Sequence, residues 1–454
     1  MMPNNVRNIA IILASGSGTR FRSETPKQFL KLAGKRVIEH TLDCFQNHAG
    51  IDEIIIVTSR EQIALMEEII LHGDYSKVTR VLLGGDTRQA SSAAGIAAIK
   101  GDNHKVLVHD AVRPLLDAAT IDRCLNALEH FDAVDTGVPS PDTVIQVDAE
   151  NCITKIPDRE QLRLGQTPQA FRAGLLRKAH ALAATDSELK VTDDCGLILH
   201  YGLGKVHVVA GDTSNIKITY PSDVYLADRL FQLRSGTFQA DENLSALQNK
   251  VVVVLGASKG IGQAVQQLAE LHGAHIVAAS RSSGMDVANS QAVRHLFTSA
   301  MEQFGRIDYV VNTAGVLHTG LLAGQSDEVI DEQLLTNLRG SIVVAREAFE
   351  VLKEQGGSIA LFASSSYTRG RARSAVYSAT KAAVVNLMQG LAEEYLPFNV
   401  RINAINPERT ATPMRTENFG NEPHDSLLDA KTVAGATLRV LLTERTGQVI
   451  DVRR

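Results

Sequence analysis

Tyr377 and Lys381 belong to the first of two groups of residues whose types and spacing suggest chemistry. They are four residues apart, so both would lie on one face of a helix. A free tyrosine has a pKa of about 10, and we expect the cation to lower the pKa of Tyr377 towards neutral pH, where its hydroxyl can exchange a proton. Ser364 follows the apolar run 359–362 and could hydrogen-bond a substrate carbonyl. This spacing is typical of a hydride-transfer site.

The second group is a glycine-rich loop, residues 14–20 (ASGSGTR), which follows the apolar run 9–13. Small residues let backbone N–H groups approach a triphosphate closely. The pattern is neither GxxxxGK[ST] nor GxGxxG, so it predicts neither a Walker loop nor a dinucleotide turn. Arg20 and Lys27, at the far end of the loop, would stabilise the charge that attack on an α-phosphate builds up.

Asp110 follows the apolar run 106–108, and we expect it at the carboxyl end of a strand, where α/β sheets bind ligands. A carboxylate at that position suits Mg²⁺, which combines one or two carboxylates with phosphate oxygens. Gly85 and Ser91 lie in another glycine turn, residues 84–91. These segments favour a nucleotide site in the first half of the chain.

A glycine turn of another kind, formed by Gly256, Gly260 and Gly262, follows the apolar run 251–255. Its GxxxGxG spacing between a strand and a helix suits a pyrophosphate. The next apolar run ends just before Arg281, at the position where an acidic residue would bind the ribose hydroxyls of NADH. Arg281 and Lys259 are cations instead, which favours NADPH.

The elements that would position these residues are short apolar runs alternating with helical stretches, which predicts parallel sheets covered by helices on both faces. The fold class is therefore α/β, with two doubly wound domains. Residues 235–249 are polar and precede a fresh strand, so we expect a first domain over 1–234, a linker over 235–249 and a second domain over 250–454.

Composition limits the classes of partner. The chain has 454 residues and a net charge of −5, which indicates neither a nucleic-acid nor a membrane-surface partner. It shows no signal peptide and no apolar run of the roughly 20 residues that cross a bilayer. Its four cysteines are scattered without a CxxC pair, as in proteins of a reducing compartment. We expect a cytoplasmic protein that acts on small molecules.

The first half resembles the cytidylyltransferases of the methylerythritol-phosphate and ribitol-phosphate type, in the order of its motifs over residues 9–230. The resemblance implies that Arg20 and Lys27 are the catalytic cations on CTP and that Asp110 lies near the metal. It implies CTP binding by Ala14, Ser15, Gly16, Gly18, Gly85, Ser91 and Asp110, and polyol-phosphate binding by Thr143, Arg159, Thr167 and Lys217. The family's arm, here residues 141–157, reaches into a partner subunit, so the resemblance also implies a homodimer.

The second half resembles the short-chain dehydrogenase/reductases over residues 250–452. The resemblance implies catalytic roles for Asn337, Ser364, Tyr377 and Lys381. It implies cofactor binding by Gly256, Ser258, Lys259, Gly260, Ile261, Gly262, Arg281, Asp286, Asn312, Ala314, Gly315, Tyr377 and Lys381. At one position the chain differs from the family, because Glu408 stands where the family usually has glycine.

Together the halves resemble bifunctional enzymes that reduce D-ribulose 5-phosphate to D-ribitol 5-phosphate with NADPH and couple it to CTP, giving CDP-ribitol. The implied cofactors are NADPH and Mg²⁺. Two alternatives stay open: a 2-C-methyl-D-erythritol 4-phosphate cytidylyltransferase fused to an unrelated reductase, and a nucleotide-sensing module. Cys195 and Gly196 differ from the residues that the methylerythritol-phosphate cytidylyltransferases usually have at these positions, which disfavours the first alternative. We also hypothesise that one or two of Arg369, Arg371 and Arg373 bind a substrate phosphate.

Overall fold

The computed structural model describes residues 6–16, 21, 25–32, 34–191, 193–234 and 244–454. The chain divides into two compact units, Met1–Leu230 and Phe231–Arg454, and each is described by itself. Of the expected linker, residues 235–243 lie outside the described part. Leu244 and Leu247 form part of a short helix, Leu244–Leu247, and are buried in the core of the second unit.

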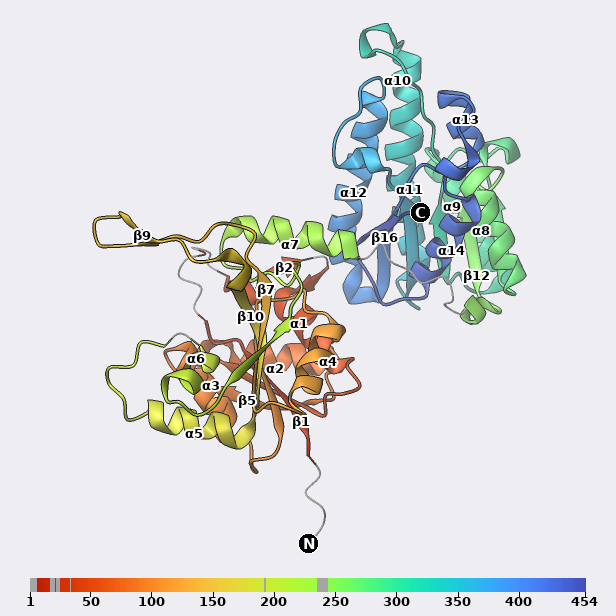
Figure 1. Cartoon of the computed structure of the whole chain (residues 1–454). Helices are drawn as coiled ribbons and strands as arrows, with labels where there is room; N and C mark the ends of the chain where they lie inside the picture. The colour runs from red at the N-terminus through yellow and green to blue at the C-terminus, as the bar shows by residue number, and fades with distance from the viewer. Residues whose placement is uncertain (1–5, 17–20, 22–24, 33, 192, 235–243) are drawn as a thin grey trace. The chain divides into compact units, whose positions relative to one another are not determined.

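The first unit is built on a seven-stranded sheet with the order β11-β7-β10-β6-β1-β4-β5 (Figure 1). Its strands are β1 Asn8–Leu13, β4 Glu53–Thr58, β5 Val78–Leu83, β6 Lys105–Asp110, β7 Ala133–Pro139, β10 Arg163–Arg172 and β11 Val206–Ala210. A small hairpin, β2 Lys31–Leu32 with β3 Lys35–Arg36, follows the glycine-rich loop. Its helices are α1 Val37–Gln46, α2 Ile63–His72, α3 Arg88–Ala97, α4 Ala118–Ala127, α5 Ala173–Ala183, α6 Asp194–His200 and most of α7 Pro221–Arg234.

Alternation along β1 places a separate core on each face of this sheet, because successive side chains of a strand point to opposite sides. Ile9 and Ile11 are buried with residues of α3, α5 and α6. Ala10 and Ile12 are buried with residues of α1, α2 and α4. Burial on both faces explains why the strand reads as an uninterrupted apolar run.

One strand of the first sheet corrects the expectation of parallel sheets. β10 runs antiparallel to both β6 and β7. The chain between β7 and β10 turns back through an arm that carries a short hairpin, β8 Gln146–Val147 with β9 Ile153–Lys155, and a strand that returns directly beside its predecessor is antiparallel. The arm projects from the sheet (Figure 1). The sheet is therefore mixed, within the predicted α/β class.

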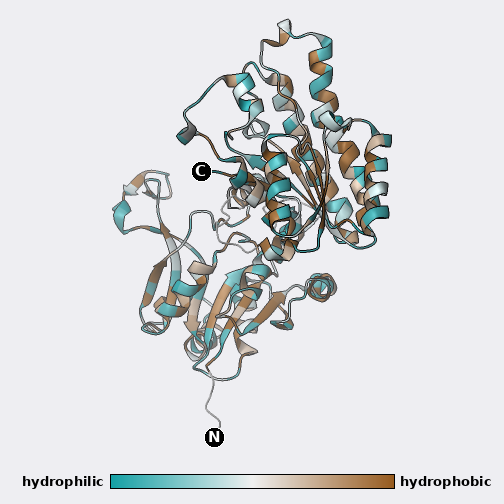
Figure 2. Cartoon of the chain, turned by 90° about the vertical axis from the view of Figure 1, so that its right-hand side faces the viewer, coloured by the Kyte–Doolittle hydropathy of each residue, from teal (hydrophilic) through white to brown (hydrophobic). Residues whose placement is uncertain are grey.

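The second unit has a six-stranded parallel sheet with the order β13-β12-β14-β15-β16-β17. Its strands are β12 Val251–Leu255, β13 His275–Ala279, β14 Tyr309–Asn312, β15 Gly357–Phe362, β16 Val400–Pro407 and β17 Val449–Val452. Its helices are α8 Gly260–Leu271, α9 Ser290–Phe304, α10 Asp327–Gln333, α11 Gly340–Leu352, α12 Ala375–Tyr395, α13 Pro413–Phe419 and α14 Ala430–Leu441. Figure 2 shows the apolar strands inside each unit and polar residues on the outer helices.

The helices of the second unit divide between the two faces of its sheet. α8 and α14 contribute to the core on one face, whereas α9, α11 and α12 contribute to the core on the other. The helices that precede and follow β13 therefore lie on opposite faces of the sheet, and β13 and β14 lie on either side of β12. Ligands of doubly wound sheets bind at such a switch point. Within the described residues, no helix combines the length and the hydropathy that crossing a bilayer requires.

Candidate active sites

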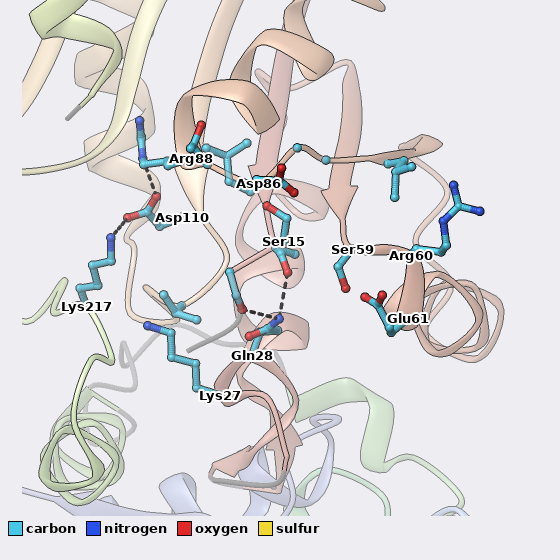
Figure 3. Close-up of a pocket in the computed structure, with 18 residues that line it drawn as sticks. Ser15, Lys27, Gln28, Ser59, Arg60, Glu61, Asp86, Arg88, Asp110 and Lys217 are labelled. Carbon is cyan, nitrogen blue, oxygen red and sulfur yellow. Dashed lines mark hydrogen bonds and ion pairs between the residues drawn. The ribbon is translucent and has the colours of Figure 1, made fainter. Parts of the chain in front are cut away.

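A cavity of about 630 Å³ lies in the first unit at the carboxyl ends of four neighbouring strands, β6, β1, β4 and β5. Leu13, Ser59, Leu83 and Asp110 mark these four strand ends on its wall. The position agrees with the expectation for Asp110, which is the last residue of β6. Figure 3 shows Asp110 with Lys217 and Lys27 towards one end of the cavity and Arg60 at the other.

Ser15 and Gly84 form a close contact between the two glycine turns. The Ser15 hydroxyl lies 2.7 Å from the hydroxyl of Ser91. A Cβ on Gly84 would lie 2.7 Å from Ser91 Oγ, and one on Gly85 would lie 2.5 Å from the Ala90 side chain. Only glycine fits such approaches without a shift of its neighbours. The cavity lining includes Ala14, Ser15, Gly16 and Gly85 among the predicted CTP-binding residues.

Asp110 is ion-paired to two cations in the cavity wall. One carboxylate oxygen lies 3.2 Å from Arg88 Nε, and the other lies 2.7 Å from Lys217 Nζ. Burial alone would raise the pKa of Asp110, but Arg88, Lys217 and Arg113 outweigh it and hold this pKa well below its ordinary value. Asp110 therefore stays ionised and holds the cations around it in place.

Arg88 is held from behind by a second buried carboxylate, that of Asp194. Arg88 Nη1 donates to Asp194 at 2.8 Å, and Asp194 also accepts from Ser92 Oγ at 2.7 Å and lies 2.9 Å from His180 Nε2. This network is anchored on α3, α5 and α6. Sequence reasoning placed Arg88 in the glycine turn of residues 84–91 but predicted neither Arg88 nor Asp194 as a site residue.

Lys27 lines the same cavity, where its Nζ donates to the backbone oxygen of Ile218 at 3.0 Å. The other predicted catalytic cation, Arg20, and the predicted CTP ligand Gly18 lie outside the described residues. Lysine and arginine side chains converging on a cavity of this kind can neutralise a triphosphate and the charge that develops at its α-phosphorus.

The remaining predicted polyol-phosphate residues do not line this cavity. Thr167 is buried beneath Asp110, whose backbone N–H donates to Thr167 Oγ1 at 3.1 Å. Thr143 is exposed on the arm, and Arg159 is exposed just after it. Their part in the site stays a prediction that depends on the arm reaching another subunit.

The cavity fits a magnesium–triphosphate better than a metal held by protein alone. Asp110 and Asp86 both line it, whereas the described residues contain no group of three or more His, Cys, Asp or Glu side chains placed to hold a metal ion. Mg²⁺ commonly takes one or two carboxylates and completes its shell with phosphate oxygens and water. Asp110 would be the ligand, sharing its oxygens with Arg88 and Lys217.

A larger cavity, of about 870 Å³, lies in the second unit at the carboxyl ends of β13, β12, β14 and β15. Part of its lining is a cradle formed by Gly256 and Gly262, where a side chain would not fit. Gly256 has a φ of 84°, and a Cβ there would lie 2.6 Å from the backbone nitrogen of Ala314. A Cβ on Gly262 would lie 2.3 Å from the backbone oxygen of Gly256. The start of α8 at this cradle suits the pyrophosphate of a dinucleotide.

Most of the predicted cofactor-binding residues meet at this cavity. Those that line it are Gly256, Ser258, Lys259, Gly260, Ile261, Gly262, Arg281, Asp286, Ala314 and Gly315. Asn312 is buried behind the lining and accepts a hydrogen bond from the Ala314 N–H at 3.2 Å. Tyr377 and Lys381 lie beside the cavity rather than in its lining.

The four predicted catalytic residues of the second unit do come together. Lys381 Nζ lies 5.6 Å from the centre of the Tyr377 ring and donates to the backbone oxygen of Phe362 at 2.8 Å. The side chain of Ser364 hydrogen-bonds to Tyr377. Asn337 lies in a π-helical turn, Leu334–Arg339, and its amide nitrogen donates to Thr380 Oγ1 at 3.3 Å.

The pKa of Tyr377 corrects one expectation. Burial raises it, and the hydrogen bond from Ser364 only partly opposes this effect. Burial also lowers the pKa of Lys381, to about 8. Tyr377 is therefore a protonated acid near neutral pH, which suits a group that donates a proton to a carbonyl oxygen.

The lowered pKa of Lys381 predicts a pH limit for carbonyl reduction. Below about pH 8 its ammonium group is charged, and as pH rises through about 8 the charge beside Tyr377 is lost. We expect kcat/KM for reduction to fall with rising pH above that value, measured as NADPH oxidation at constant ionic strength. Lys381→Arg keeps its charge across this range, so the same inflection in that variant would contradict the assignment.

The three arginines between Ser364 and Tyr377 do not line the cavity of the second unit. Arg369, Arg371 and Arg373 are all exposed. Arg373 has a φ of 65°, and its backbone oxygen accepts from the Gly320 N–H at 2.7 Å. Their binding of a substrate phosphate stays a prediction.

Two family models each match a different part of the chain. Residues 8–233 match the family model of 2-C-methyl-D-erythritol 4-phosphate cytidylyltransferase, and residues 242–448 match that of enoyl-(acyl carrier protein) reductase. A solved structure of 3-ketoacyl-(acyl-carrier-protein) reductase from Brucella melitensis, complexed with NADH, is 26% identical with a TM-score of 0.43, and the match covers 45% of this chain and 97% of that one.

Two curated relatives differ in how much of the chain they match. The bifunctional ribulose 5-phosphate reductase/CDP-ribitol pyrophosphorylase Bcs1 of Haemophilus influenzae is 44% identical over 457 residues, which cover 99% of this chain and 96% of that protein. The 2-C-methyl-D-erythritol 4-phosphate cytidylyltransferase of Thermobifida fusca is 41% identical over 240 residues, which cover 51% of this chain and 96% of that protein.

Proposed function

The chain belongs to the family of bifunctional ribulose 5-phosphate reductase/CDP-ribitol pyrophosphorylases, and from that premise we propose that it catalyses both reactions of that name. The second unit reduces D-ribulose 5-phosphate to D-ribitol 5-phosphate with NADPH. The first unit couples D-ribitol 5-phosphate to CTP, giving CDP-ribitol and pyrophosphate. The observation that carries this proposal is 44% identity over 99% of the chain, through both cavities.

In the reductase site, NADPH supplies a hydride to the ketone carbon of the substrate when it is bound. Tyr377 donates its proton to the ketone oxygen, which becomes the new hydroxyl group. Ser364 hydrogen-bonds to Tyr377 and orients that hydroxyl. The Lys381 ammonium group, held by the backbone oxygen of Phe362, would return a proton to Tyr377, and Asn337 lies next to this lysine through its hydrogen bond to Thr380.

In the transferase site, a phosphate oxygen of ribitol 5-phosphate attacks the α-phosphorus of CTP, and the bond to pyrophosphate breaks. Lys27 and Arg20 stabilise the charge on the α-phosphate oxygens. Lys217, fixed 2.7 Å from Asp110, orients the attacking phosphate. Mg²⁺ at Asp110 would neutralise the departing pyrophosphate.

We also propose that the arm contributes to a homodimer. Ile145, Ile153 and Ile156 on the arm are 50%, 57% and 60% exposed, and apolar side chains gathered on a projecting segment are typical of a contact surface. Thr143 and Arg159 would then act in the partner subunit's cavity. A cytoplasmic location follows from the use of CTP and NADPH. The domain limits 1–234 and 250–454 stay a prediction.

A coupled assay tests the proposal. Full-length protein incubated with ribulose 5-phosphate, NADPH, CTP and Mg²⁺ is expected to oxidise NADPH and release pyrophosphate. Omitting NADPH should abolish pyrophosphate release, and adding ribitol 5-phosphate should restore it. The matched family model of residues 8–233 is that of 2-C-methyl-D-erythritol 4-phosphate cytidylyltransferase. Preference for 2-C-methyl-D-erythritol 4-phosphate over ribitol 5-phosphate as the acceptor would therefore support that activity instead.

A further inference from the structure

Arg281 is the cation best placed to meet a phosphate on the adenosine ribose, and it already has an anionic partner. It lies two residues after the end of β13 and lines the cavity of the second unit. Its Nη1 lies 2.7 Å from Glu332 Oε1, and its Nη2 donates to Thr336 Oγ1 at 2.9 Å. Glu332 and Thr336 line the cavity too. Two contacts on separate nitrogens fix the plane of the guanidinium group.

Glu332 is itself held on its other side. Its second oxygen lies 2.7 Å from His318 Nε2, and His318 also lines the cavity. Hydrogen bonds from Arg281 and His318 lower the pKa of Glu332, so its carboxylate is charged at neutral pH. The pair of Arg281 with Glu332 is therefore close to neutral at the place where a dianionic phosphate would arrive.

The other cation at this end of the cavity makes fewer contacts than Arg281. Lys259 Nζ lies 3.2 Å from Glu417, and each of these side chains is 60% exposed. The Arg281 side chain is 62% exposed and that of Glu332 is 36% exposed, so water screens both ion pairs. What distinguishes the pair of Arg281 and Glu332 is two further contacts, that of Arg281 with Thr336 and that of Glu332 with His318.

We infer that Glu332 weakens the preference for NADPH over NADH, by offsetting the charge of Arg281 that a 2′-phosphate requires. The carboxylate repels the 2′-phosphate of NADPH and leaves the uncharged 2′-hydroxyl of NADH unaffected. Glu332 thus moderates a preference for NADPH that Arg281 and Lys259 would otherwise make stronger. This inference rests on the proposed function, because it requires that the cavity bind a nicotinamide dinucleotide.

The test is Glu332→Gln in the full-length chain. Glutamine keeps an oxygen for Arg281 but removes the charge, and Thr336 still fixes the guanidinium group. Dissociation constants for NADPH and NADH are measured directly, by the fluorescence of the reduced nicotinamide, without sugar phosphate. We expect NADPH to bind about threefold to tenfold more tightly and NADH to change by less than about twofold.

Asp331→Asn is the matched control, since it removes the same charge one residue away on α10. Asp331 is exposed and does not line the cavity, so both constants should stay as in the wild type. Equal or weaker NADPH binding by Glu332→Gln would overturn the inference, as would an equal gain in Asp331→Asn. Wild-type protein that binds NADPH but does not reduce ribulose 5-phosphate would contradict the proposed function alone, whereas binding of neither dinucleotide would contradict both.

Discussion

Tyr377→Phe is expected to lower kcat/KM for the reduction of ribulose 5-phosphate by about a thousandfold while leaving the transfer of CMP to ribitol 5-phosphate intact. The variant lacks the only hydroxyl that this mechanism uses as an acid, and general acid catalysis contributes about 10² to 10⁴ in rate. Loss of the hydrogen bond with Ser364 should cost about 1 kcal/mol of stability. NADPH oxidation and pyrophosphate release, measured separately, give the two rates.

The control for Tyr377→Phe is Tyr395→Phe, on the same helix α12. Its hydroxyl is also buried and donates to the backbone oxygen of Ala345 at 3.2 Å. This variant loses a comparable hydrogen bond far from the cavity, so its thermal unfolding should shift slightly and neither rate should change. Retention of more than about a tenth of the reductase rate in Tyr377→Phe would contradict the role of Tyr377 as the acid.

Lys27→Met is expected to produce the opposite pattern: pyrophosphate release from CTP falls by about 100- to 1,000-fold, and the reductase rate is unchanged. A fixed charge aimed at a developing oxyanion is commonly worth that much, and methionine preserves the length and apolar stem of lysine. Its contact with the Ile218 backbone oxygen is also lost, which should cost about 1 kcal/mol.

Lys178→Met serves as the matched control for Lys27→Met. Lys178 is an exposed residue of α5 in the same unit and does not line the cavity. Both rates should match those of the wild type. If Lys27→Met kept its transferase rate, or if it lowered the reductase rate as much as the transferase rate, a role at the α-phosphate would be contradicted.

The local sequence was enough to predict the position of residues that end or follow a buried strand. The residue after β12, Gly256, and the last residue of β6, Asp110, were placed at ligand-binding edges from apolar runs alone. The reason is that parallel strands end at one edge of a sheet, so sequence position fixes spatial position. The same holds for Tyr377 and Lys381, whose helical spacing alone places them on one face of α12.

Contacts between segments that are far apart along the chain could not be predicted from the sequence. Asp194 meets Arg88, 106 positions away, and Glu332 meets Arg281, 51 positions away. Nothing local distinguishes such a carboxylate from one facing water. Burial also reversed the expected direction for the pKa of Tyr377, because desolvation depends on everything packed around a group. The reversed direction of β10 was missed for a similar reason, since the arm that causes it has no strong pattern of its own.

The arm leaves and rejoins the first sheet at a single point, because Pro139 at the end of β7 lies opposite Arg163 at the start of β10. The segment between them could be exchanged for a tight turn, and these two strands would still be neighbours. Its length and composition can therefore diverge between relatives without disturbing the folding of the sheet, since extending a surface loop costs little free energy. Such changes would leave the lining of the cavity of the first unit unaltered, because no residue of the arm belongs to it.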